Sequence, residues 1–467
     1  MNDFSLIPLG DVATFRNGLN FNKSSDGQKI KIIGVSDFKN RLTPNYEELE
    51  VIQIDGKLGN EDYLHFGDIV FVRSNGNKAL VARSLFIDKD EELSFSGFCI
   101  KARIVDETLL LRKYFSYFTK TSQFRYAISK GTIGTNINNL NQGILSDLKV
   151  PAPDIATQQV IVSFLSDLDS KIELNNRINA ELEAMAKTIY DYWFVQFDFP
   201  ISKELATQMG KPELEGRPYK SSGGKMVYNK ELKREVTEGW EVKKITDFIE
   251  VRDGTHDSPK RSTTGKFLIT SKHLTKSGVD FSTAYLISNE DYIAVNKRSK
   301  VDQGDILISM IGTIGNIYYV QDSEIDFAIK NMGLFKTSQN KDLADYIYSY
   351  VESAHGQQYF LSSISGSIQN YLTLGVLRNT PLLIPSQDHL DKFNSIVRPI
   401  YGKIHSNNQE NQELASLRDW LLPMLMNGQV KVGEVKTNKA TYTAQQELDD
   451  LAGRMAAERR EKYEVKE

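Results

Sequence analysis

The chain contains one pattern twice, and this internal repeat limits its fold more than any other feature of the sequence. The residues GDIVFV at 67–72 resemble GDILIS at 304–309, an offset of 304 − 67 = 237. The pair Val150-Pro151 corresponds to Ile384-Pro385, at 384 − 150 = 234. A repeat of this length predicts two similar domains, and 467 residues are enough for both.

Each half also contains a long helix with the same irregular stripe of apolar residues. The stripe follows spacings of three and four, as one face of a helix does, through residues 161–189 and again through 393–421. Asparagines interrupt both stripes at equivalent places, at an offset of 407 − 175 = 232. The stripe residues Ile161, Leu165, Leu168, Ile172, Asn175, Asn179, Leu182 and Ile189 correspond to Phe393, Val397, Ile400, Ile404, Asn407, Asn411, Leu414 and Leu421.

The two helices are expected to pair antiparallel, since each begins beside its own domain. Asn175 and Asn179 would then face Asn407 and Asn411 near the middle of the pair. Buried amides in a helix interface cost stability but fix its register. The prediction is a register lock; the alternative is that these amides are half-exposed and the helices pack elsewhere.

The rest of each half indicates a β-rich domain. Short apolar strands alternate with Gly- and Asn-rich turns, and a Pro-containing junction precedes each long helix. We predict an α+β fold: two β-rich mixed domains joined by two long helices that pair as an antiparallel coiled coil, with an internal pseudo-two-fold repeat. The expected segments are a first domain at 1–150, a first helix at 151–199, a linker at 200–237, a second domain at 238–384, a second helix at 385–428 and a charged tail at 429–467.

Composition predicts a cytoplasmic protein whose bulk charge does not indicate a nucleic-acid partner. The net charge is −4, so any nucleic acid would have to meet a locally basic surface. Cys99 is the single cysteine, which excludes an intrachain disulfide. The first ten residues lack the pattern of a signal peptide, and no apolar run is long enough to span a membrane.

From Ile7 to about Gly428 the chain resembles the specificity subunit of type I restriction–modification systems. The resemblance is carried by the junctions VPAPDIATQQVIVSFLSDLDSKI and LLIPSQDHLDKF, by the helix end IYDYWFVQFDF, by PYKSSGGKMVYNKEL and GWEVKKI at the entry to the second half, and by WLLPMLMNGQV. It implies two target-recognition domains, each reading one half of a bipartite double-stranded DNA target. It also implies helices that act as a spacer and dock two methyltransferase subunits, which restriction/translocase subunits join.

The same resemblance implies that the chain has no active site. S-adenosylmethionine, ATP and Mg²⁺ are expected on the partner subunits, with no cofactor and no metal here. The sequence has no phosphate-binding loop of the Gly-x-x-x-x-Gly-Lys-Ser/Thr type, no Asn/Asp-Pro-Pro-aromatic tetrad and no His-Glu-x-x-His. Two alternatives stay open: a self-sufficient nuclease or methyltransferase, and a scaffold whose domains both bind proteins.

Three kinds of stretch are candidates for DNA contact, because Arg, Asn and Gln read base edges while Lys and Arg neutralise phosphates. A basic loop near the start of each domain contributes Arg16, Asn20, Asn22, Lys23, Lys39 and Arg41, and Arg252, Lys260, Arg261, Lys272 and Lys276. The residues after the first Gly-Asp strand contribute Arg73, Asn75, Asn77, Lys78 and Arg83. Amide-rich turns before each junction contribute Thr132, Asn136 and Asn138, and Ser367, Gln369 and Asn370.

The two domains are predicted to read different bases, because SMIGTIGNIYY at 309–319 is far less basic than its counterpart in the first half. The target is therefore expected to be asymmetric. The alternative for the basic loops is a solvated surface, and the alternative for the amide-rich turns is that Asn and Gly only shape the turn.

The ends of both long helices are unusually aromatic and apolar. The candidate partner-docking residues are Tyr190, Tyr192, Trp193, Phe194, Trp420, Leu421 and Leu422. They would form two equivalent docks for two copies of one partner. The alternative is that they pack against neighbouring domains of the same chain.

Overall fold

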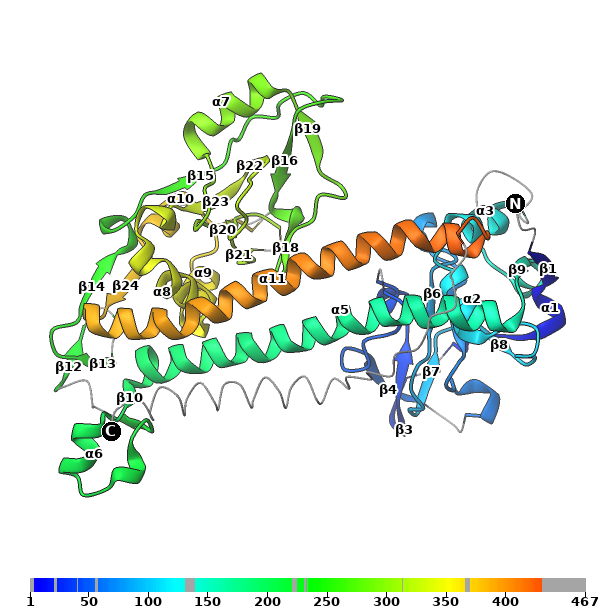
Figure 1. Cartoon of the computed structure of the whole chain (residues 1–467), viewed down its shortest axis with the longest axis horizontal. Coiled ribbons are helices and arrows are strands. Elements are labelled where there is room, and N and C mark those ends of the chain that lie inside the picture. Colours follow the sequence, from blue (N-terminus) through cyan, green and yellow to red (C-terminus); the bar gives the residue numbers. More distant parts are fainter. Residues whose placement is uncertain are drawn as a thin grey trace. The chain divides into compact units, whose positions relative to one another are not determined.

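In the computed structural model the chain folds into two compact units (Figure 1). Unit 1 combines the described residues up to Leu174 with those from Gln412 onward, and unit 2 is Asn175–Asn411. The structure describes residues 4–20, 23–39, 41–54, 58–130, 139–220, 225–230, 232, 234–312, 314–365 and 370–430.

Unit 1 is built on two small sheets and a strand pair. The four-stranded sheet has the order β2 (Ala13–Asn17), β8 (Cys99–Ile104), β5 (Ile69–Val72) and β6 (Ser84–Phe86). The three-stranded sheet has the order β4 (Glu50–Ile54), β3 (Lys23–Ile33) and β7 (Leu93–Phe95), and β1 (Ser5–Pro8) pairs antiparallel with β9 (Lys149–Ala152). All four residues of β5 are buried, which is why this strand is an apolar run without polar alternation.

Short helices cover the sheets of unit 1. They are α1 (Leu9–Val12), α2 (Arg112–Phe118), α3 (Ser122–Lys130) and α4 (Gln142–Ser146). The buried core includes Phe71 from β5, Phe118 and Phe124 from the helices, and Leu422 and Met426 from the second long helix. The chain after Gln412 therefore completes the core of the domain that the N-terminal half begins.

Unit 2 repeats the strand order of unit 1. Its four-stranded sheet has the order β15 (Val251–Asp253), β23 (Met332–Phe335), β20 (Ile306–Ser309) and β21 (Ile317–Tyr319). Its three-stranded sheet has the order β19 (Tyr285–Ile287), β16 (Lys266–Thr270) and β22 (Phe327–Lys330), and β14 (Glu241–Lys244) pairs with β24 (Pro381–Ile384). In both three-stranded sheets the central strand has one antiparallel and one parallel neighbour.

The helices of unit 2 also follow those of unit 1. The counterparts of α2, α3 and α4 are α8 (Lys341–Glu352), α9 (Ala354–Ser362) and α10 (Leu374–Arg378), whereas α7 (Asn289–Ser299) is an addition. The segment before the second domain contains β10 (Asp198–Pro200), α6 (Lys203–Gln208), β11 (Pro218–Lys220), β12 (Met226–Asn229) and β13 (Arg234–Thr237), and β17 (Leu274–Thr275) pairs with β18 (Gly278–Val279) within that domain.

The repeated Gly-Asp pair makes the same turn in both units. Gly67 and Gly304 have φ values of 91° and 92°, a backbone conformation that glycine adopts without strain. The following aspartates, Asp68 and Asp305, are buried and each accepts a backbone N–H three residues upstream. A buried lysine from the neighbouring strand or its end lies beside each carboxylate: Lys101 Nζ is 4.0 Å from Asp68, and Lys336 Nζ is 2.5 Å from Asp305.

A tyrosine ties each domain to the junction before its long helix. The hydroxyl of Tyr114 donates to the carbonyl of Pro151 at 3.0 Å, and that of Tyr346 donates to Leu383 at 2.5 Å. Both the donors and the acceptors differ by 232 positions (346 − 114 and 383 − 151). The repeat therefore extends to single hydrogen bonds, and it pairs Pro151 with Leu383 rather than with Pro385, which the sequence comparison had matched to it.

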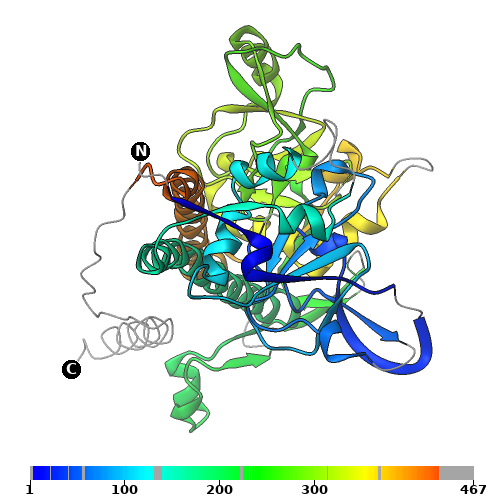
Figure 2. The same cartoon turned by 90° about the vertical axis from the view of Figure 1, so that its right-hand side faces the viewer.

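The long helices are α5 (Ile155–Tyr190) and α11 (Gln387–Met426). At 1.5 Å per residue they are about 54 and 60 Å long. Asp154 caps the start of α5 by accepting the N–H of Thr157 at 2.9 Å. A π-helical turn, η4 (Asp191–Gln196), follows α5, and Phe197 then turns the chain with φ 60°. Figure 2 shows α5 and α11 nearly end-on and side by side.

Within unit 2 the two helices run antiparallel and meet through amides. Asn175 Nδ2 donates to Asn411 Oδ1 at 3.0 Å and to Glu410 at 2.8 Å. Asn407 Nδ2 donates to Asn179 Oδ1 at 2.8 Å. Residue numbers fall along α11 as they rise along α5, which defines the antiparallel direction. Asn175, Asn179 and Asn407 are buried, and Asn411 is half-buried.

The predicted α+β class, the repeat of a β-rich domain and the antiparallel helix pair are confirmed. The helices are shorter than their expected segments. The first helix begins after the junction because β9 occupies Lys149–Ala152, and the second begins at Gln387 because β24 occupies Pro381–Ile384.

Candidate nucleic-acid interface

The basic loop at the start of the first domain is only partly paired within the protein. Arg16, on β2, forms an ion pair with Asp62, and its side chain keeps 41% exposure. Asn20 is exposed. Asn22 and the side chain of Lys23 lie outside the described residues.

The structure brings three of the predicted residues to one pocket of about 470 Å³ in unit 1. Lys39 and Arg41 come from the basic loop, and Arg83 comes from the loop before β6. Lys39 is paired with Glu48 at 2.8 Å, and Arg83 donates to the carbonyl of Phe38 at 3.2 Å. Residues that the sequence did not single out complete this positive lining: Lys120, Arg125 and Arg418.

The loop after β5 has a mainly structural use for its asparagines. Asn75 Oδ1 accepts the N–H of Asn77 at 2.7 Å, and Asn77 Oδ1 accepts the N–H of Ala79 at 3.1 Å. Such side-chain bonds shape turns. Arg73 is half-buried, and the side chain of Lys78 lies outside the described residues.

The amide-rich turns are largely outside the described part of the chain. This holds for Thr132, Asn136 and Asn138 in the first half and for Ser367 and Gln369 in the second. Asn370 is described and is exposed. Whether these residues contact bases stays a prediction.

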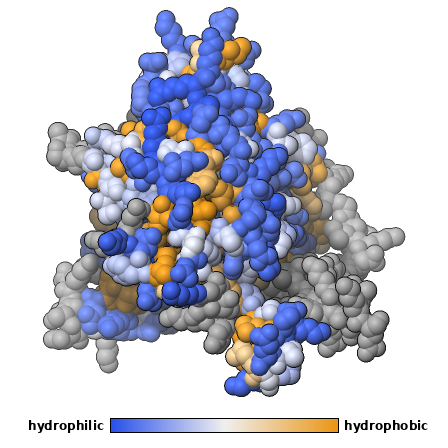
Figure 3. Space-filling model, turned by 90° about the vertical axis from the view of Figure 1, so that its left-hand side faces the viewer, coloured by the Kyte–Doolittle hydropathy of each residue, from blue (hydrophilic) through white to orange (hydrophobic). Residues whose placement is uncertain are grey.

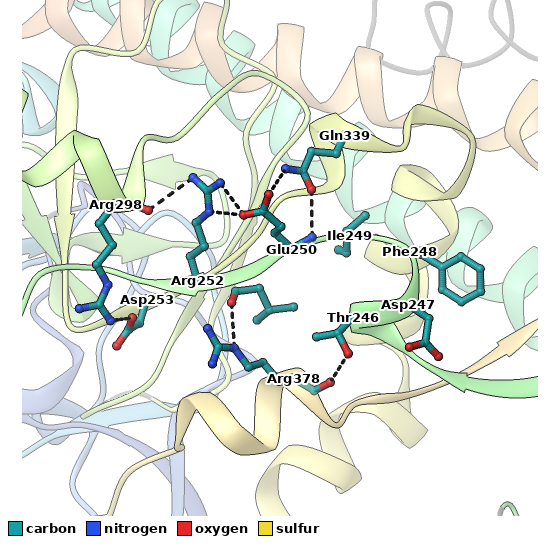
Figure 4. A pocket seen from close by; sticks show the side chains of 11 residues that line it. Thr246, Asp247, Phe248, Ile249, Glu250, Arg252, Asp253, Arg298, Gln339 and Arg378 are labelled. Carbon is teal, nitrogen blue, oxygen red and sulfur yellow. Dashed lines mark hydrogen bonds and ion pairs between the residues drawn. The ribbon is translucent and has the colours of Figure 1, made fainter.

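In the second domain, Arg252 lines a pocket of about 610 Å³ together with Arg298 and Arg378 (Figure 4). Arg252 Nε donates to Glu250 at 2.7 Å, and the bond to Arg252 lowers the pKa of that carboxyl. Glu250 also accepts from Gln339 at 3.1 Å. The guanidinium of Arg252 is therefore compensated, in contrast to Arg41 in the first domain, which forms no ion pair with a described residue.

A second ion pair fixes the loop that follows β15. Arg298, from the C-terminal end of α7, pairs with the buried Asp253, whose other oxygen lies 3.0 Å from His256 Nε2. His256 Nδ1 in turn lies 2.9 Å from Asn331 Oδ1. This network orders the start of the loop between β15 and β16, on which Lys260 and Arg261 are exposed. The predicted basic loop does not continue through the later candidates: Lys272 lies in a 3-10 turn after β16 and Lys276 between β17 and β18, and both are exposed.

The predicted partner docks need correction. Tyr190, Trp193 and Phe194 are buried in the core of unit 2, where Phe194 lies 4.7 Å from Tyr346 and 4.9 Å from Phe393, measured between ring centroids. Leu422 is buried in the core of unit 1, and Leu421 packs beside it. The alternative that these residues pack against domains of the same chain therefore describes them, because the aromatic end of α5 completes a hydrophobic core.

Two members of that set remain accessible: Tyr192 is 37% exposed and Trp420 is 61% exposed. The face viewed in Figure 3 shows hydrophobic residues scattered among hydrophilic ones. Tyr192 and Trp420 are the residues of the predicted docks that a partner could still reach.

Five basic residues of the two pockets were not found from the sequence: Lys120, Arg125, Arg298, Arg378 and Arg418. Each lies in or beside a helix, whereas the sequence candidates were chosen from Gly- and Asn-rich loops. One signal in the sequence could have drawn attention to Lys120. The equivalent residue of the second half is Glu352 (352 − 120 = 232), so the charge is reversed between the two halves.

Two absences hold for the described residues. No group of three His, Cys, Asp or Glu side chains is placed to hold a metal ion. None of the described helices combines the length and apolar character that a membrane span requires.

Comparison with known proteins identifies the family. A family model described as "Type I restriction modification DNA specificity domain" matches residues 1–184 and 237–416. The type I restriction enzyme MjaIX specificity subunit of Methanocaldococcus jannaschii is 26% identical over 337 residues, covering 71% of this chain and 72% of the relative. The HindI specificity subunit of Haemophilus influenzae is 24% identical over 479 residues, covering 92% and 100%.

A solved structure shares the fold. The crystal structure of the type I restriction–modification system S subunit from M. genitalium has a TM-score of 0.50 at 16% identity, covering 91% of this chain and 97% of that one. Because the family model covers both halves of the chain, as the resemblance predicts, the chain belongs to the family of type I restriction–modification DNA specificity proteins.

Proposed function

We propose that this chain is the specificity subunit that reads an asymmetric, bipartite DNA target for a type I restriction–modification complex. The observation that carries the proposal is that one domain occurs twice in a chain whose two long helices pair through amides at equivalent positions. Two readers joined by paired helices suit a target in two parts with an unread gap. Each domain would enter the major groove, about one helical turn of DNA apart.

Differences between the domains support an asymmetric target. Four of the six cationic side chains that line the pocket of the first domain have no ion pair with a described residue, whereas Arg252 and Arg298 of the second domain are held by Glu250 and Asp253. Side chains that are already paired present different donors to DNA than unpaired ones do. Two equal half-sites would not require this difference.

The chemistry would belong to the partners. The relatives are named specificity subunits, so this chain serves as the non-catalytic, DNA-recognising component of the complex. We propose that two methyltransferase subunits dock on it and bring S-adenosylmethionine, and that restriction/translocase subunits bring ATP and Mg²⁺. Exposed Tyr192 and Trp420 are candidate contacts for these partners.

The test is to co-express the chain with its modification subunits and to map methylated bases on host DNA. We expect one bipartite motif with methylation in both halves. A chimaera that replaces residues 238–384 with the second domain of a relative should change one half of the motif and leave the other half and the gap unchanged. A continuous motif, or a motif directed by one domain alone, would contradict the proposal and favour the protein-scaffold alternative.

A further inference from the structure

The basic pocket of unit 1 has a counterpart in unit 2 that the internal repeat generates. The counterpart is a pocket of about 360 Å³ lined by residues of α5, α8 and α11. Lys120 in the first pocket corresponds to Glu352 in the second (352 − 120 = 232). Arg418 corresponds in the same way to Ala186 (418 − 186 = 232).

The correspondence covers both walls of each pocket. Thr121 and Asp169 correspond to Ser353 and Tyr401 at the same offset of 232 (353 − 121 and 401 − 169). In each unit one wall is the turn between two short helices, and the other wall is formed by the two long helices. The pockets therefore have equivalent positions in their domains, but their charges differ.

The basic pocket contains far more positive than negative charge. Two carboxylates line it, Asp169 and Asp419, and Arg418 is paired with both, at 2.7 and 2.8 Å. Lys39 is paired with Glu48. Among the residues that the structure describes, the other four cationic side chains of the lining have no ion pair: Arg41, Arg83, Lys120 and Arg125.

The ammonium of Lys120 is held where it faces the other cations. It donates to the carbonyl oxygens of Ser84 at 2.6 Å and Arg41 at 2.9 Å, although the residue as a whole remains exposed. Desolvation in the pocket, followed by repulsion from Arg125, Arg418 and Arg83, lowers the pKa of Lys120 to about 8. An anion in the pocket would favour the charged form and raise that pKa again.

The counterpart pocket has no such surplus of positive charge, because two carboxylates, Glu183 and Glu352, and two lysines, Lys187 and Lys276, line it. Burial within it raises the pKa of Glu352 to about 7, and Glu183 adds to this effect while Lys276 opposes it. Lys187 in this pocket is already paired with Asp191 at 2.7 Å. Glu352 and Glu183 would repel an anion in this pocket, so the pocket is not suited to binding phosphate.

We infer that the basic pocket of unit 1 takes a backbone phosphate of the bound DNA, and that its counterpart in unit 2 takes none. The inference rests on the proposed function, because the phosphate is that of the target DNA. Arg41 and Arg83 reach the pocket from the domain, while Arg418 reaches it from the helix pair, so one phosphate would be held by both. In a chain with net charge −4, four unpaired cationic groups in one pocket are a local surplus that suits DNA.

The experiment uses the full chain assembled with its modification subunits. The dissociation constant for a duplex that carries the target is measured over a range of KCl concentrations for the wild type, for Arg125→Gln and for Lys187→Gln. Arg125 is exposed on α3, and Lys187 supplies the matched loss of one charge beside the counterpart pocket. The logarithm of the association constant falls linearly with the logarithm of the salt concentration, and each lost phosphate contact reduces the magnitude of that slope by about 0.9.

We expect Arg125→Gln to lower the slope by about one phosphate contact, and to weaken target and non-target duplexes by the same factor. Lys187→Gln should leave the slope unchanged. The methylated motif should stay the same for both variants. An unchanged slope for Arg125→Gln would overturn the inference, and so would a loss confined to the target sequence, because the residue would then read bases.

Inorganic phosphate distinguishes a free-ion site from a backbone contact. The pKa of Lys120 can be followed through the pH dependence of its acylation, with and without ligand. Target DNA should raise this pKa, whereas inorganic phosphate at matched ionic strength should not. If phosphate alone raises it equally, the pocket is a free-anion site and the inference fails.

Failure of the inference and failure of the proposed function give different results. If the wild-type complex shows no salt-dependent binding to DNA, the proposed function itself is wrong. If the wild type binds with a steep salt dependence and Arg125→Gln binds identically, the function stands and the pocket has another occupant. In that case weaker assembly of Arg125→Gln with its partner subunits would point to an acidic protein surface.

Discussion

At the residue scale, the buried lysine–aspartate pairs show how the repeat keeps a structural solution while changing its details. Asp68 is beside Lys101 at 4.0 Å but also accepts two bonds from Arg103, at 2.6 and 2.8 Å. Asp305 has Lys336 as its cationic partner, and Ser338 supplies a backbone N–H at 3.1 Å. Asp68 in unit 1 thus has two cationic partners. Asp305 in unit 2 has Lys336 and, among the described residues, no second cationic partner.

This difference predicts unequal costs for removing the two lysines. Lys336→Met should destabilise unit 2 by about 3–5 kcal/mol, because it leaves Asp305 buried without a counter-charge. Lys101→Met should cost less, since Arg103 still compensates Asp68. Urea unfolding monitored by hydrogen exchange in β20 and β5 measures the two units separately. Equal losses in both units would show that Arg103 does not replace Lys101.

At the element scale, the sequence predicted the long helices and their direction because their signal is a regular period. Two stripes that deviate at the same places, at Asn175 and Asn407, carry information that short strands lack. The aromatic end of α5 could not be assigned from the sequence, because large aromatic residues are typical both of an exposed docking surface and of a buried core. Phe194 proves to be buried because the π-helical turn directs the chain into the core of unit 2.

The amides between the helices should fix the register of the pair without adding to its stability. Replacing Asn175, Asn179, Asn407 and Asn411 together by Leu should maintain or raise the stability of the pair while admitting shifted pairings. Asn179→Leu alone should cost about 1–3 kcal/mol, because it leaves the buried amide of Asn407 without its acceptor.

Register can be read from distances between spin labels at Glu181 and Gln409, which are exposed positions on the two helices. The wild type should give one narrow distribution, and the fourfold Leu variant a broader one. Since Cys99 is buried, it should not compete for the label. A distribution that stays narrow in the fourfold variant would mean that other contacts set the register.

At the scale of the whole molecule, the repeat, the domain class and the family could be predicted from the sequence, but most of the basic pocket could not. Repeats and helix periods are visible in one dimension. The basic pocket joins Arg41, Arg83, Lys120 and Arg418, which lie far apart in sequence, and only the folded chain brings them together. Loop composition identified Arg41 and Arg83 but had no means to find Lys120 or Arg418.

Unit 1 is made from one segment that precedes unit 2 in the sequence and one that follows it. This predicts that the order of the two halves along the sequence is not essential for folding. Strand β1 pairs with β9, while Leu425 and Met426 of α11 pack in the same core. Joining the two ends of this chain by a flexible linker and opening it between Gly223 and Gly224, outside the described residues, keeps every described contact. The permuted chain should fold and direct methylation to the same motif.

A permutant opened between Asn175 and Asn176 is the matched control. It breaks α5 where Asn175 and Asn176 bond to Asn411, so it should lose the helix pair and the methylation directed by both domains. Circular dichroism and mapping of methylated bases compare the two permutants with the wild type. If opening at Gly223 is as damaging as opening within α5, the linker between the halves has a structural role, and the two halves are not interchangeable in order.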